Sequence, residues 1–100
     1  MNENEQSLLV RSGEEFEVSL AAVPSSGHEW QIVTCPREIE FIARSYVQPS
    51  DDAHSAGGTS TCVFRFRAST AGQYTIPFVL KRSWEKRTIS KRIFQVHVSD

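Results

Sequence analysis

The chain has 100 residues and a formal net charge of −1 at pH 7, which suits one domain with a hydrophobic core of its own. Its hydrophobic fraction of 39% and charged fraction of 23% are those of a globular domain. The small net charge argues against a general polyanion binder. No apolar run is long enough to span a bilayer, so we expect no membrane partner.

The first residues, Met1 to Glu5, are polar and acidic, unlike a secretory signal. Two alternatives remain: a cytoplasmic chain, or a secreted or periplasmic chain from which a signal was removed. The cysteines, Cys35 and Cys62, do not decide between them. Their spacing fits no metal site, and a disulfide between them is possible but not favoured. We expect no cofactor.

Stretches in which apolar and polar residues alternate predict short strands along the chain. Residues 1–12 are expected to form an N-terminal tail with a possible short first strand at 8–10, and residues 13–100 a single domain. The strands predicted within that domain cover residues 14–20, 30–33, 39–47, 61–68, 73–80 and 88–98.

Three of these predicted strands carry local detail. The strand over 39–47 is expected to turn four side chains to one face, Ile39, Phe41, Ala43 and Val47. Pro77 removes a backbone donor and indicates an edge position or a bulge. In the last strand, the adjacent apolar residues Ile93 and Phe94 break the alternation and indicate a bulge or a twist.

No segment shows the 3.6-residue period of an amphipathic helix. About seven to eight short strands predict an all-β, immunoglobulin-like antiparallel β-sandwich. Its sheets are expected to pack through apolar side chains from most of the strands: Phe16, Val18, Leu20, Trp30, Ile32, Phe41, Phe64, Phe66, Tyr74, Ile76, Phe78, Phe94 and Val96.

Three segments between predicted strands have unusual compositions, and in a sandwich of this kind they can emerge at the same end. Pro24-Ser25-Ser26-Gly27 is small and prone to turn. Ala56-Gly57-Gly58-Thr59, within a long stretch from Gln48 to Ser60, allows close backbone approach. Arg82-Ser83-Trp84 places an indole at the tip of a hairpin, where it either folds back on its own sheet or waits for a partner.

In this order and spacing, the segments resemble the chagasin-like inhibitors of papain-family cysteine peptidases. The family pattern is Asn-Pro-Thr-Thr-Gly followed shortly by Trp, then Gly-Gly, then Arg-Pro-Trp. The resemblance runs from about Gly13 to Val98. Here Val23 replaces the Asn, a Ser25-Ser26 pair replaces the two Thr, and Ser83 replaces the Pro. Without that proline, the hairpin tip is expected to lose more freedom on binding.

The resemblance implies a reversible, tight-binding inhibitor of papain-like (clan CA) peptidases that does no chemistry itself and wedges three loops into the active-site cleft. Pro24 to Gly27 would lie across the catalytic cysteine, Gly57-Gly58 along the non-primed side, and Trp84 on the primed side with Arg82 reaching polar groups nearby. The implied binding residues are Pro24, Ser25, Ser26, Gly27, His28, Ala56, Gly57, Gly58, Thr59, Arg82, Ser83 and Trp84. The inhibitor is expected to be a monomer.

Other functions are weighed against this one. The main alternative is a non-inhibitory immunoglobulin-like module that binds a protein or a glycan. Six basic residues between Lys81 and Arg92 would suit nucleic acid, but we expect no such partner. An enzyme is disfavoured, because no base and acid accompany the serines. Protonation of His28 near pH 6 could change binding to an acidic cleft. Trp30 is expected in the core, and His54 and His97 on the surface.

Overall fold

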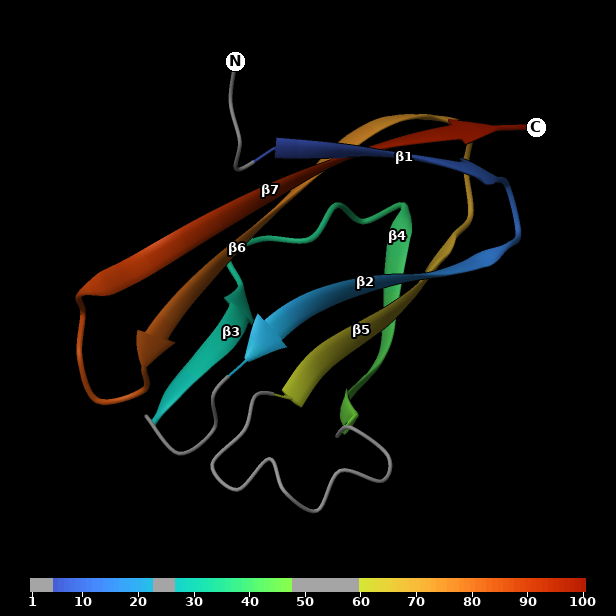
Figure 1. Ribbon diagram of the computed structural model, residues 1–100. Coiled ribbons are helices and arrows are strands. Elements are labelled where there is room, and N and C mark those ends of the chain that lie inside the picture. The colour runs from blue at the N-terminus through green and yellow to red at the C-terminus, as the bar shows by residue number, and fades with distance from the viewer. Residues whose placement is uncertain (1–4, 23–26, 48–59) are drawn as a thin grey trace.

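The computed structural model describes residues 5–22, 27–47 and 60–100. In these ranges the chain forms seven strands, shown in Figure 1: β1 (Glu5–Arg11), β2 (Glu15–Ala22), β3 (His28–Ile32), β4 (Ile39–Val47), β5 (Ser60–Ala68), β6 (Gly72–Arg82) and β7 (Thr88–Ser99). None of the described residues belongs to a helix that is long and apolar enough to cross a membrane.

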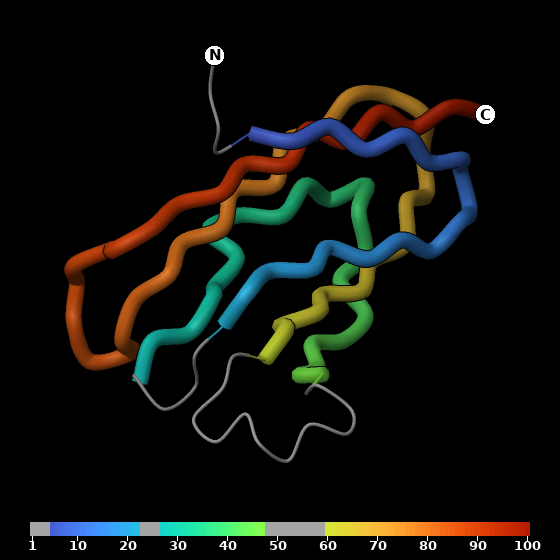
Figure 2. Tube along the Cα trace, in the orientation of Figure 1, coloured from blue at the N-terminus to red at the C-terminus, as the bar shows by residue number. Residues whose placement is uncertain are grey.

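The strands form two sheets that face each other (Figure 1). One has the order β1-β7-β6-β3 and the other the order β2-β5-β4. This confirms the predicted all-β, immunoglobulin-like sandwich. β1 runs parallel to β7, as the chain trace in Figure 2 shows, while the other described pairings are antiparallel. β1 begins at Glu5, earlier than the short strand predicted at residues 8–10.

The core lies between the sheets and is built from alternate residues of their inner faces. Ten of the thirteen predicted core residues are buried; Ile32 and Tyr74 are partly buried, and Phe41 is 47% exposed. Phe64, Phe66 and Phe78 are almost fully buried and stack or tilt against one another with ring centroids 4.9 to 6.4 Å apart. Burial of each phenyl ring contributes about 2 kcal/mol to folding.

The prediction of which β4 side chains share one face is wrong beyond Phe41. The register with β5 shifts between Phe41 and Ala43, so Ala43 lies opposite the outward-facing Arg65 and Tyr46 lies opposite the buried Cys62. One extra residue at a β-bulge inverts the side-chain alternation that follows it. Ala43 and Val47 therefore lie on the outer face.

At Ile93 and Phe94, where the sequence indicated a bulge or a twist, the structure has no bulge. Both residues pair without a break with β6, and the register shift lies nearer the hairpin, between Leu80 and Lys81. Pro77 is not on an edge strand, because β6 lies between β7 and β3. The Val33 amide donates to the Pro77 carbonyl at 2.9 Å, so the side of Pro77 that lacks a donor faces the end of β3.

Candidate functional site

The strand ends next to the three predicted segments gather at one end of the sandwich, along the lower side of Figure 1 from left to centre. In one sheet, the end of β2 at Ala22 pairs with Ser60, and the end of β4 at Val47 pairs with the next residue of β5. In the other sheet, β3 begins at His28, opposite Arg82 at the end of β6. The described strand ends that flank the predicted segments therefore lie at the same end.

A hydrogen bond ties the two sheets together at this end. The indole Nε1 of Trp30 donates to the backbone oxygen of Ala21 at 2.8 Å. Trp30 is 3% exposed, so its predicted place in the core is confirmed. The bond satisfies a buried donor and fixes the start of β3 against the end of β2.

The Trp84 indole lies against Gly27. The backbone of Gly27 has φ +82°, and a Cβ placed on it would be 3.2 Å from Cη2 of Trp84 and 3.7 Å from Nε of Arg82. Two of the predicted segments are thus in contact. Even so, Trp84 remains 72% exposed, so the indole is supported at one edge and open to solvent elsewhere.

A tight turn positions Trp84. The Glu85 amide donates to the Arg82 carbonyl at 3.1 Å, and the two side chains form an ion pair at 3.4 Å. Because no described non-glycine residue has positive φ, the turn is of type I, with Ser83 and Trp84 at its two central positions. A backbone hydrogen bond and a side-chain ion pair thus both join the first and last residues of this four-residue turn.

Charged and titratable side chains from β3 and β4 lie near this turn. His28, half-buried, lies opposite Arg82 in the ladder. Glu29 lies 3.9 Å from the Arg44 guanidinium, which also donates to the Trp30 carbonyl at 3.5 Å. The carboxylate of Glu29 therefore lies between two strands at the open edge of the sandwich.

The two cysteines are free thiols. Burial raises the pKa of both, and in Cys62 this outweighs the opposing hydrogen bond from Tyr46. The thiol of Cys35 donates to the Ile39 carbonyl at 3.3 Å. Among the described residues, no group of three or more His, Cys, Asp or Glu could hold a metal ion.

The structure brings five of the twelve predicted binding residues together: Gly27, His28, Arg82, Ser83 and Trp84. The other seven, Pro24, Ser25, Ser26 and Ala56 to Thr59, lie outside the described residues, as does His54. Sequence reasoning missed Glu85 as the residue that closes the turn. The signal was present, since an acid three residues after Arg82 has the spacing of a turn-closing pair.

We compared the chain with curated proteins and with solved structures. No curated protein matches the sequence. Two solved structures share the fold. A crystal structure of the cysteine protease inhibitor EhICP2 from Entamoeba histolytica has a TM-score of 0.81 at 18% identity, over 96% of this chain and 88% of that one. A solution structure of amebosin has a TM-score of 0.70 at 16% identity, over 98% and 100%.

The family comparison covers almost the whole sandwich. The model of the chagasin family peptidase inhibitor I42 matches residues 9–98, from β1 to the end of β7. This range includes the Gly27–Trp84 contact, the turn at Arg82 and all three predicted segments. The chain therefore belongs to the chagasin family of peptidase inhibitors.

Proposed function

We propose that this protein is a reversible, tight-binding inhibitor of papain-like cysteine peptidases that inserts one end of its sandwich into the active-site cleft. The observation that carries the proposal is the exposed indole of Trp84, supported by Gly27 at the end where the three segments begin. Family membership supports the inhibitory role. The neighbour named as a cysteine protease inhibitor supports the class of target.

In this proposal, Pro24 to Gly27 lies across the catalytic cysteine and offers main chain as a substrate does. The segment joins β2 to β3, whose ends are tied by the Trp30–Ala21 hydrogen bond. A short connection between two fixed strands has little freedom to bring its carbonyl into line with an attacking thiolate, so cleavage is slow. The inhibitor blocks the cleft and takes no part in the chemistry.

Trp84 is the anchor on the primed side. An indole that is 72% exposed offers a large apolar face, and packing it against a wall of the cleft is worth about 2 kcal/mol or more. The type I turn and the Gly27 contact hold the ring before binding, so less freedom is lost when the complex forms. Ala56 to Thr59 lies along the non-primed side, where an extended segment can pair with the peptidase backbone.

The test is a titration of the protein against papain and a cathepsin L-like peptidase with a fluorogenic substrate. We expect competitive inhibition that is reversed on dilution, with the inhibitor recovered intact by mass spectrometry. A peptidase whose cleft is filled by a small covalent inhibitor serves as the control and should not bind.

Absence of inhibition at micromolar protein would overturn the proposal. Binding to the peptidase with the filled cleft would mean that the contact lies elsewhere on the enzyme. Either result would favour the alternative, a non-inhibitory module that binds a protein or a glycan.

A further inference from the structure

The β6–β7 hairpin, residues 81–92, is the most basic part of the chain. It contains six Lys or Arg and a single acid, Glu85, for a formal charge of +5. Because the whole chain carries −1, the other residues sum to −6. Positive charge is therefore concentrated in the hairpin that carries Trp84.

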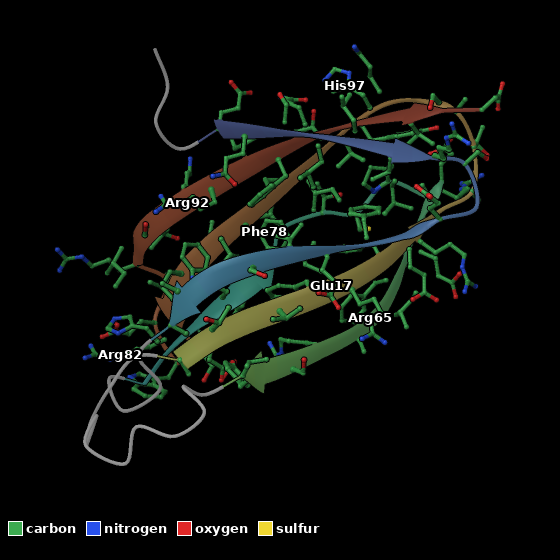
Figure 3. All side chains as sticks on the ribbon, turned by 45° about the vertical axis from the view of Figure 1, so that its right-hand side comes forward. Glu17, Arg65, Phe78, Arg82, Arg92 and His97 are labelled. Atoms are coloured by element: carbon green, nitrogen blue, oxygen red, sulfur yellow. The ribbon has the colours of Figure 1, made fainter. Side chains whose placement is uncertain are left out.

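Four of these cations form no ion pair within the described ranges: Lys81, Lys86, Arg87 and Lys91. Lys81 lies opposite Glu29 in the ladder, but that carboxylate forms its ion pair with Arg44. Arginines on the other sheet are matched instead; Arg65, for example, pairs with Glu17, as labelled in Figure 3. Within the part of the chain that the structure describes, ion pairs therefore leave most of the hairpin's charge uncompensated.

Apolar side chains lie among these cations. Trp84 is 72% exposed and Ile89 is 51% exposed. Figure 3 shows Arg82 at this end of the molecule, near the start of β3. A solvated face carries charge alone, whereas interaction surfaces combine exposed aromatic and aliphatic groups with a charged rim.

We propose that the β6–β7 hairpin is a docking surface for an acidic region beside the cleft of the target peptidase. Its cations steer the approach and raise the association rate, while Trp84 sets the lifetime of the complex. Charge at the rim of an interface acts mainly on association, and salt screens it over about 10 Å at 0.1 M. This inference rests on the proposed inhibitory function and adds a preference for peptidases with acidic cleft rims.

The experiment measures association and dissociation rates with two papain-like peptidases whose cleft rims have opposite charge. Between low salt and about 0.3 M NaCl, association with the acidic enzyme should slow about tenfold. The double variant Lys86→Glu, Arg87→Glu should lose about the same factor at low salt, with dissociation changed less than about twofold.

The matched control is Arg11→Glu, Arg37→Glu, which changes the charge by the same amount at the opposite end of the molecule. Arg11 pairs with Ser99 at the end of β7, and Arg37 precedes Ile39, which pairs with Ala68 at the end of β5. An association rate within about twofold of the parent supports a localised docking surface. An equal loss in both variants would show that net charge alone acts, and would overturn the proposal.

The remaining outcomes are also decisive. Inhibition whose association rate is independent of salt overturns this inference and leaves the proposed function intact. If neither peptidase is inhibited, the proposed function fails instead. Tight binding of the parent to a DNA oligonucleotide in low-salt gel shifts, lost in the hairpin variant, would assign the cations to nucleic acid and overturn the inference.

Discussion

Trp84, at the tip of the β6–β7 hairpin, and Gly27, just before β3, lie against each other, with only 3.2 Å between Cη2 of the indole and the place where a Cβ on Gly27 would stand. A glycine with φ +82° leaves that place empty, so the ring can lie over the backbone. The two segments on which the inhibitory proposal depends are therefore one surface, and a change in either is expected to affect the other.

Trp84→Ala should separate binding from folding. We expect inhibition to weaken by tenfold or more, about 1.4 kcal/mol, while the melting temperature moves by less than about 3 °C because the side chain is exposed. Trp30→Phe is the control, since it removes the hydrogen bond to Ala21 and part of the core. It should lower the melting temperature by about 5 °C or more. A similar loss in Trp84→Ala would mean that its indole supports the fold.

Gly27→Ala tests the contact itself. The new Cβ would meet the indole at 3.2 Å, so the ring must move, and positive φ adds about 1 kcal/mol of backbone strain. Gly13→Ala has comparable strain at φ +91°, but its Cβ meets nothing within 4 Å. Both variants should lose similar stability in urea, whereas inhibition should weaken for Gly27→Ala alone. Equal inhibition constants for the two would contradict the shared surface.

Ser83→Pro should strengthen inhibition. Proline suits the first central position of a type I turn, and at a compatible site it stabilises by about 0.4–1 kcal/mol through the freedom it removes from the unbound chain. We expect inhibition to tighten about twofold to fivefold. Glu85→Gln removes the charge that pairs with Arg82 and should weaken inhibition. In the double variant, the proline should restore much of that loss; no restoration would show that Glu85 acts other than through the turn.

The thiols of Cys35 and Cys62 are expected to make the stability of the fold depend on pH. Burial raises the pKa of Cys35 and Cys62, so folding disfavours their thiolates. Their contribution to stability is complete below the ordinary thiol pKa of about 8.5 and is lost as pH rises above it. We expect the free energy of unfolding in urea to fall as pH rises above about 8.5, and less so in Cys62→Ala after correction for its cavity. A curve of unchanged shape would rule out a role for Cys62.

Sequence patterns predicted the sandwich well because burial on one face imposes a period of two. Phe16, Val18 and Leu20 alternate with polar residues, and all three are buried. The prediction failed where the register between β4 and β5 shifts. A bulge after Phe41 moves the side chains in the rest of β4 to the opposite faces. A bulge depends on pairing with another strand, so the alternation of one strand contains too little information to locate it.

Only part of the candidate site could be predicted from the local sequence. The composition of Arg82-Ser83-Trp84 pointed to an unusual hairpin tip, and the structure describes that tip as exposed. The contact between Trp84 and Gly27 joins residues 57 positions apart, which depends on the packing of two strand ends. Local sequence contains no signal for such a contact. The roles of Pro24 to Ser26 and Ala56 to Thr59 stay predictions.

The parallel pairing of β1 with β7 has a mechanical consequence. The strands are joined by seven paired positions, from Glu5 and Ile93 to Arg11 and Ser99. Force applied to the start of β1 and the end of β7 would slide one strand along the other and load these rungs together, instead of opening them one at a time. In single-molecule pulling between these two points, the sandwich should rupture abruptly at high force. Attachment at Gly72 and Val98, which are paired at the end of the antiparallel β6–β7 ladder, should peel those strands apart at lower force.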